Sequence, residues 1–115
     1  MSDFSELEER CFEFVRRVKE LIKCTKMTVT NYSIASQLID SSGSVGANYI
    51  EANEGLSKKD FIYRVRICKK ESKESRFWLR LLDCEEKYKA EQKSLINEAT
   101  ELMLIFAGIL RKCNN

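Results

Sequence analysis

Basic side chains concentrate in one part of this 115-residue chain. Residues 58–89 contain eleven of the twenty lysines and arginines, but only six of the eighteen acidic residues. If this segment is helical, each residue turns by about 100°, and nine cations fall within an arc of about 120°. This basic stripe consists of Lys58, Lys59, Arg66, Lys69, Lys70, Lys73, Arg76, Arg80 and Lys87. A stripe of this kind can neutralise the phosphates of a nucleic acid.

The basic stripe has a second interpretation, as a solvated helix face paired in part with acids on the first helix or on a neighbouring subunit. Asp83 and Glu86 lie just outside the arc and cannot cancel its charge. Phe77 is the only aromatic neighbour, so we expect any RNA to be recognised by its shape and backbone. The predicted nucleic-acid contacts are Lys59, Arg66, Lys69, Lys70, Lys73, Arg76 and Arg80.

Two pairs of carboxylates, Glu51 with Glu54 and Glu71 with Glu74, stand on successive predicted helices. Facing carboxylates can hold two metal ions, but the known di-iron arrangement also needs histidines, and the chain has none. A magnesium or manganese site and acid–base catalysis are the alternatives. We favour ion pairing, with Glu71 and Glu74 opposite the basic stripe and accepting from arginines such as Arg64 or an arginine of a neighbouring helix. We therefore predict no metal, no cofactor and no catalytic residue.

A polar ridge and small residues mark the middle of the second predicted helix. The ridge advances by four, three and four residues, through Gln37, Ser41, Ser44 and Asn48. It could bind a ligand, but we favour hydrogen bonding across a close helix–helix contact. Gly43 and Gly46 would let that neighbour approach, and no phosphate-binding loop motif surrounds them.

The composition excludes several classes of protein. Hydrophobic residues make up 43% and charged residues 33%, which is typical of a globular chain. With no proline and four glycines, the chain lacks the turn residues of a β-sandwich or barrel. The absence of histidine removes Ser–His and Cys–His nucleophile pairs and the common zinc sites. We therefore do not expect an enzyme.

The five cysteines are odd in number, widely spaced and free of C-x-x-C motifs. The opening Met1-Ser2-Asp3 leads straight into charged residues, so no signal peptide is predicted. We expect free, buried thiols and a cytoplasmic location. The longest apolar run, Leu102 to Leu110, is too short to cross a bilayer, so no membrane partner is expected.

Apolar residues recur every three or four positions in four segments, which predicts four helices. Their expected ranges are about Phe4 to Cys24, Asn31 to Glu54, Lys58 to Tyr88, and Ser94 to Lys112. Thr30 or Asn31 is the expected cap of the second helix, and Ser57 with Asp60 resembles a capping box for the third. These elements predict an all-α, antiparallel up-down-up-down four-helix bundle, as one domain over residues 1–115.

The apolar faces identify the expected core. The predicted positions are Phe4, Leu7, Cys11, Val15, Val18, Ile22, Ile34, Leu38, Val45, Tyr49, Ala52, Phe61, Val65, Cys68, Ser72, Leu79, Leu82, Leu95, Ala99, Leu102, Phe106 and Ile109. The third and fourth helices carry second apolar strips, at Ile67, Trp78 and Leu81, and at Ile96, Met103 and Leu110. A helix that is apolar on two sides needs a second partner, so we expect an oligomer.

Three stretches of the chain resemble a known family. They are QLIDSSGSVGANYIEA at residues 37–52, SKKDF at 57–61, and KESKE with WLRLL at 70–74 and 78–82. Together they resemble the four helix bundle protein family, whose members include proteins encoded in intervening sequences of bacterial 23S ribosomal RNA genes. The resemblance is close over about residues 30–84 and extends to the flanking helices in pattern.

The resemblance implies a four-helix bundle that assembles as a ring-like homopentamer and is not an enzyme. Nucleic-acid binding is the function usually suggested for the family. A related group, the accessory proteins of diversity-generating retroelements, forms strongly basic pentameric barrels that partner a reverse transcriptase. This chain has a net charge of +2. The partners that the resemblance implies are a further copy of the chain, RNA or DNA, and a reverse transcriptase.

Overall fold

Four long α-helices make up nearly all of the protein. The computed structural model describes residues 3–55 and 57–114. The helices are α1 (Asp3–Cys24), α2 (Val29–Asn53), α3 (Lys58–Leu81) and α4 (Lys89–Cys113), with a 3-10 turn, η1 (Glu86–Tyr88), before α4. Over these residues there is no strand, which confirms the prediction of an all-α fold with four helices.

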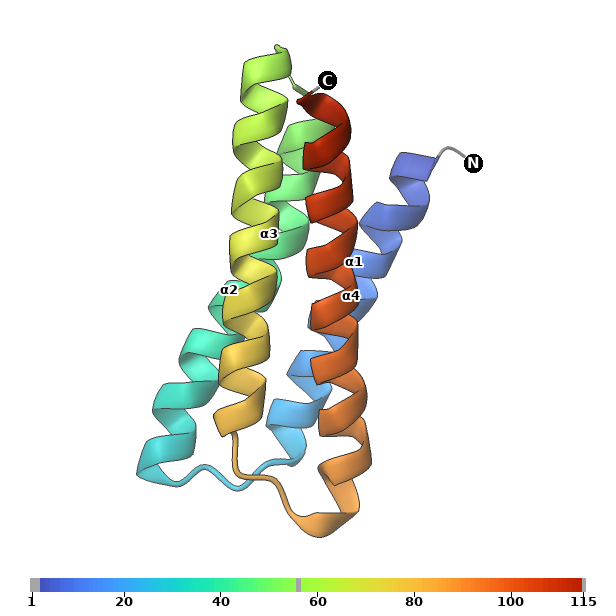
Figure 1. Cartoon of the computed structure of the whole chain (residues 1–115). Helices are drawn as coiled ribbons and strands as arrows, with labels where there is room; N and C mark the ends of the chain where they lie inside the picture. The colour runs from blue at the N-terminus through green and yellow to red at the C-terminus, as the bar shows by residue number, and fades with distance from the viewer. Residues whose placement is uncertain (1–2, 56, 115) are drawn as a thin grey trace.

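The helices lie side by side in a body of 45 × 26 × 20 Å. Contacts are most extensive between α2 and α3 and between α3 and α4, while α1 packs on α2 and, less extensively, on α4. Figure 1 shows the α1–α2 and α3–α4 connections at one end of the molecule. The start of α3 and the end of α4 lie together at the opposite end. The long α3 helix thus runs beside two partners and leaves one side to solvent.

The interior contains most of the predicted core positions, including Leu38, Val65, Leu79, Leu95 and Leu102, which are all fully buried. The rings of Tyr49 and Phe106 meet there with centroids 5.7 Å apart. Leu7, Val15, Ile22, Ile34, Phe61 and Ile109 are only partly buried. The side chain of Phe4 lies outside the described part of the chain.

Two core residues of α1, Phe14 and Leu21, were not among the predicted positions. The buried stripe of α1 steps through Cys11, Phe14, Val18 and Leu21. These alternating steps of three and four are the spacing of a narrow, coiled-coil-like seam. Val15 sits at the edge of that seam, which is why it is only partly buried.

The small residues of α2 allow close packing against α1, as expected. A β-carbon at Gly46 would lie 3.3 Å from the β-carbon of Cys11, a tight approach between two helices. At Gly43 the nearest atom, a methyl carbon of Val15, would be 3.9 Å away, which is ordinary contact. Of these two glycines, Gly46 therefore marks the closer approach of α2 to α1.

The start of α2 differs from the expected one, whereas the start of α3 does not. The cap of α2 is Thr28, whose hydroxyl oxygen accepts from the backbone nitrogen of Asn31 at 3.1 Å, so the prediction of Thr30 or Asn31 was wrong. Asn31 is instead buried, and its amide donates to the carbonyl oxygens of Lys26 and Asp83. The Ser57 cap of α3 is confirmed, because its hydroxyl accepts from the backbone nitrogen of Asp60 at 3.1 Å.

The third helix is shorter than predicted and the fourth is longer. Helix α3 ends at Leu81, because Leu82 adopts an extended backbone, and α4 begins at Lys89 rather than Ser94. The connection is held by side chains from elsewhere, Asn31 on α2 and Gln92 on α4. Lys87 consequently lies on η1 and not on the α3 stripe, which corrects the sequence-based assignment.

The five cysteines are free thiols, but they are not all buried. Cys11, Cys68 and Cys84 are buried, whereas Cys24 is exposed and Cys113 is partly exposed, so the expectation of burial was wrong for Cys24. Burial raises the pKa of the Cys11 and Cys68 thiols to about 12. Within residues 3–55 and 57–114, no helix has the length and hydropathy needed to span a bilayer.

Candidate nucleic-acid interface

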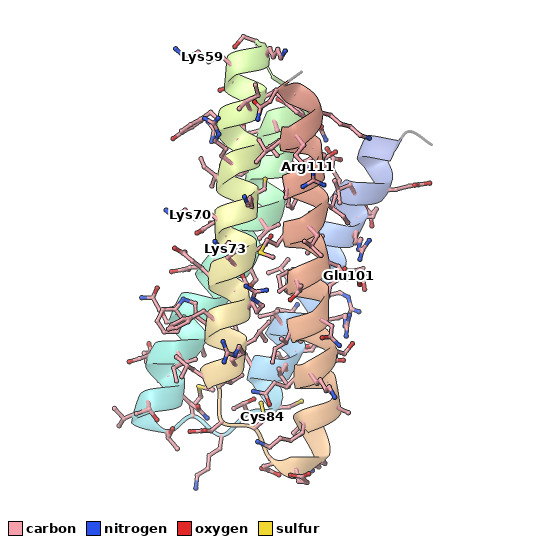
Figure 2. All side chains as sticks on the ribbon, in the orientation of Figure 1. Lys59, Lys70, Lys73, Cys84, Glu101 and Arg111 are labelled. Carbon is pink, nitrogen blue, oxygen red and sulfur yellow. The ribbon has the colours of Figure 1, made fainter. Side chains whose placement is uncertain are left out.

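The cations predicted on α3 share its outer side. Lys58, Lys59, Arg66, Lys70, Lys73 and Arg80 are exposed, while Lys69 and Arg76 are partly buried. Figure 2 shows the labelled Lys59 and Lys70 side chains extending outward from α3. The helix brings together all seven predicted contact residues and Lys58, and leaves out only Lys87.

The acids of α1 do not neutralise this stripe. The ion pairs between helices, as far as the chain is described, join arginines of α1 to carboxylates of α4. Arg10 donates two hydrogen bonds of 2.8 Å to Glu98, and Arg17 donates at 3.1 and 2.8 Å to Glu91. None of the ion pairs between described residues includes a cation of α3. Within the described chain, the stripe therefore keeps its positive charge.

Arg76 differs from the rest of the stripe. Its Nη1 atom donates to the hydroxyl of Thr100 on α4 at 3.3 Å, and that hydroxyl donates to the carbonyl oxygen of Ile96 at 3.1 Å. The bond from Arg76 to Thr100 joins α3 to α4. Arg76 thus supports helix packing, and the residue is only partly exposed.

Two open hollows lie along the stripe and meet at Arg66. The first, of about 500 Å³, lies between α3 and the end of α4 and is lined by Arg66, Lys69, Lys70, Lys73, Glu74 and Leu110. The second, of about 580 Å³, lies near the start of α3 and is lined by Lys58, Lys59, Ile62, Tyr63 and Arg66. Together they form a shallow basic track along α3.

Glu71 and Glu74 do not have the arginine partners that were predicted. Arg64 donates instead to the amide oxygen of Asn48 at 3.0 Å. Glu74 lines the basic hollow with Lys70 and is not on the opposite side of the helix. The ion pairs found among described residues include neither carboxylate.

Glu71 is electrostatically unusual. Its burial, together with the hydrogen bond and charge of Glu74, raises its pKa to about 7, against the opposing effects of Lys70 and of a hydrogen bond with Ser44. A carboxyl group at this pKa is partly protonated at neutral pH. That protonation lets two carboxyl groups sit together without an arginine.

In the described part of the chain, no three histidine, cysteine, aspartate or glutamate side chains lie close enough together to hold a metal ion. Glu51 on α2 and Glu54, which follows the end of that helix, are both exposed. The arrangement thus differs from a carboxylate-bridged metal centre, in which carboxylates project inward from facing helices.

The polar ridge of α2 takes part in packing between α2 and α3. Ser75 donates to the hydroxyl oxygen of buried Ser41 at 3.0 Å, and Cys68 lies 3.3 Å from the carbonyl oxygen of Val45. With the bond from Arg64 to Asn48, these contacts confirm the structural interpretation at Ser41 and Asn48. Gln37 is exposed and lies outside the interface.

Comparison with known proteins identifies the family. The model of the 23S rRNA-intervening sequence protein family matches residues 5–108. The chain belongs to this family. The match includes the stretches between residues 37 and 82 on which the sequence resemblance rests, and so confirms it.

A solved structure of similar fold supports the assignment. It is the crystal structure of a protein of unknown function from the S23 ribosomal protein family of Bacteroides thetaiotaomicron VPI-5482, with a TM-score of 0.78 and 32% sequence identity. The alignment covers 90% of this chain and 96% of that one. No curated protein matches the chain significantly. Membership of this family therefore supports the four-helix fold. The family is named after ribosomal RNA, but the comparisons indicate no activity for its members.

Sequence analysis missed one residue of this surface. Tyr63 lines the hollow beside Lys59 and Arg66, and 59% of it is exposed. The signal was present in the sequence, since Tyr63 follows Lys59 by four residues and precedes Arg66 by three. Residues at these spacings neighbour one another on a helix surface.

Proposed function

We propose that this protein is a non-catalytic nucleic-acid-binding bundle that uses the basic stripe of α3. The observation that carries the proposal is the outward-facing row of α3 cations, which has no carboxylate partner among the ion pairs of the described residues. Unpaired surface cations release phosphate-bound counterions when they contact a nucleic acid, and this release supplies binding free energy.

The distribution of charge matters more here than the net charge of +2. The acidic side chains of α4, such as Glu91 and Glu98, are held by arginines of α1. The positive field is consequently localised on α3. The shallow track through Arg66 is a surface along which a phosphate backbone can lie.

The proposal includes antiparallel, up-down-up-down helices that assemble as a ring-like homo-oligomer, with five copies as the expected number. The apolar end of α4 supports assembly, because Leu104 is 57% exposed and Ile105, Ile109 and Leu110 are only partly buried. Contiguous exposed apolar side chains mark interaction sites on folded proteins. A ring would repeat the basic stripe once in each copy and multiply its field.

Charge reversal tests the proposal. The variant Lys69→Glu/Lys73→Glu/Arg80→Glu should lower the affinity for a labelled structured RNA by at least about tenfold, because three phosphate contacts are lost. Fluorescence anisotropy gives the dissociation constants. The matched control, Lys19→Glu/Lys26→Glu/Lys93→Glu, reverses three exposed lysines on α1, the α1–α2 connection and α4. Equal affinity losses in the two variants would reject the α3 stripe as the binding surface.

The second candidate is a protein-interaction module, such as an accessory subunit of a reverse transcriptase. The observation that favours it is the same exposed apolar end of α4, which a protein partner could cover. The charge-reversal experiment distinguishes the two candidate functions. An interaction module would keep its partner through apolar contacts after the α3 cations are reversed, and the wild-type protein would not bind RNA.

A further inference from the structure

Two aromatic side chains lie among basic ones along one exposed face of α3. Successive members of this face are four or three residues apart, so they lie on one line along the helix. All seven are exposed, and we call them the aromatic–basic face: Lys59, Tyr63, Arg66, Lys70, Lys73, Phe77 and Arg80. The two rings stand out, because Tyr63 is 59% exposed and Phe77 is 53% exposed.

Both rings are held by a neighbouring side chain. The guanidinium carbon of Arg64 lies over the Tyr63 ring, 5.8 Å from its centroid. The ring of Phe77 meets that of Trp78 at 80°, with centroids 4.9 Å apart, an edge contact that aromatic pairs prefer. These contacts restrict the rotamers of the two rings, so a stacked ligand would lose less conformational entropy on binding.

We propose that single-stranded nucleic acid lies along the aromatic–basic face, with one base stacked on Tyr63 and another on Phe77. Arg66, Lys70 and Lys73, which lie between the rings, contact the phosphates of the intervening nucleotides. This inference rests on the proposed function and makes it specific. It replaces the expectation of recognition by shape and backbone alone.

The spacing of the rings suits a short single strand. Tyr63 and Phe77 are four helical turns apart, roughly 21 Å along the axis of α3. A strand that rises roughly 3.4 Å per nucleotide would cover this distance in about six steps, which leaves about five nucleotides between the two that stack on the rings. Bases inside a duplex are stacked on each other, whereas unpaired bases in loops and at ends can stack on aromatic side chains.

Charge argues against the same face of a second copy as the occupant. Five of the seven members are cations, so a symmetric contact between two aromatic–basic faces would oppose like charges. Exposed aromatic rings among cations are the combination that single-strand binding proteins use, where each ring accepts any base.

Alanine substitution of the rings tests the inference. Wild-type protein should bind a 12-nucleotide single-stranded RNA more tightly than the duplex of the same sequence. Tyr63→Ala and Phe77→Ala should each weaken single-strand binding by at least about fivefold, the lower end for loss of a stacked base. Duplex affinity and the salt dependence of binding should stay unchanged, because the rings release no counterions. Tyr63→Phe should bind like wild type.

The controls come from exposed aromatic residues on other helices. Tyr32 on α2 is 70% exposed and Phe12 on α1 is 58% exposed, so Tyr32→Ala and Phe12→Ala remove similar rings outside the face. Neither should change single-strand affinity. Trp78 is the only tryptophan and lies against Phe77, so its fluorescence should change when single-stranded RNA binds.

The outcomes separate this inference from the proposed function. No binding of either RNA by wild type at low salt would overturn both. Equal binding of single strand and duplex, unaffected by the ring variants, would overturn the stacking inference and leave an electrostatic binder. A change of oligomeric mass in Tyr63→Ala or Phe77→Ala, with RNA affinity intact, would show that the face is a protein interface and would also overturn the inference.

Discussion

The side-chain amide of Gln92 on α4 donates to the carbonyl oxygen of Leu82 at 2.7 Å, one residue past the end of α3. The same nitrogen donates to the carbonyl oxygen of Leu79 at 2.8 Å, and Gln92 itself is buried. Carbonyl groups at the end of a helix lack partners within the helix. Gln92 supplies that partner from another helix and fixes where α3 stops.

Loss of this amide should destabilise the fold. Gln92→Leu keeps the side chain large and apolar but leaves two buried carbonyl groups without their donor. At about 1–3 kcal/mol for each unsatisfied buried group, we expect the free energy of unfolding to fall by about 2–6 kcal/mol, measured by urea denaturation. Gln37→Leu changes an exposed glutamine of α2 and should stay within about 0.5 kcal/mol of wild type. A similar result for Gln92→Leu would contradict the capping role.

The two glycines of α2 should respond to alanine in opposite directions. Alanine is favoured over glycine inside a helix by about 1 kcal/mol. Gly43→Ala meets only ordinary contact with Val15 and should raise the melting temperature. Gly46→Ala places its methyl 3.3 Å from the rigid β-carbon of Cys11, and overpacking of about 1–3 kcal/mol should lower it. Thermal unfolding followed by circular dichroism compares them, and a stabilised Gly46→Ala would show that α1 can move away freely.

Glu71 should make stability depend on pH. Its pKa is raised from 4.5 to about 7 in the folded chain, chiefly by burial and then by Glu74. Between these values the folded state retains a proton that the unfolded state releases, so this group's contribution to stability falls as pH rises from about 4.5 to 7. Glu71→Gln mimics the protonated group, and should melt higher than wild type at pH 8 and like wild type at pH 4.5.

A variant of an exposed carboxylate controls for the change of net charge. Glu51→Gln on α2 should shift the melting temperature by the same small amount at both pH values. If the difference between Glu71→Gln and wild type did not change between pH 4.5 and 8, Glu71 would not titrate in this window.

The periodic features of the sequence predicted the fold well. Apolar spacing gave the four helices and a core centred on residues such as Leu38, Leu79 and Leu102, because burial of one face dominates helix packing. The ends of α3 and α4 could not be predicted in the same way. No proline or glycine marks them, and Leu82 is held in place by Gln92, a contact that depends on the tertiary structure.

The candidate site was predicted in part. A helix places cations on one side by simple geometry, so Lys59, Arg66 and Lys70 lie together as expected. The partners of Glu71 were not predictable, because Arg64 faces Asn48 across the α2–α3 contact. The exposed ring of Tyr63 follows the same helical spacing as the cations, but aromatic residues are also typical of the buried face of a helix, so the residue type alone did not indicate exposure.

The most direct test of nucleic-acid binding through the α3 stripe is a salt series with wild-type protein and a short single-stranded RNA. If about four phosphates contact the cations of α3, the logarithm of the binding constant should fall with the logarithm of salt concentration with a slope of about −3. In Lys69→Glu/Lys73→Glu/Arg80→Glu the slope should shrink toward zero as those contacts are lost. Binding that is absent at low salt, or a slope that the triple variant leaves unchanged, would contradict the account.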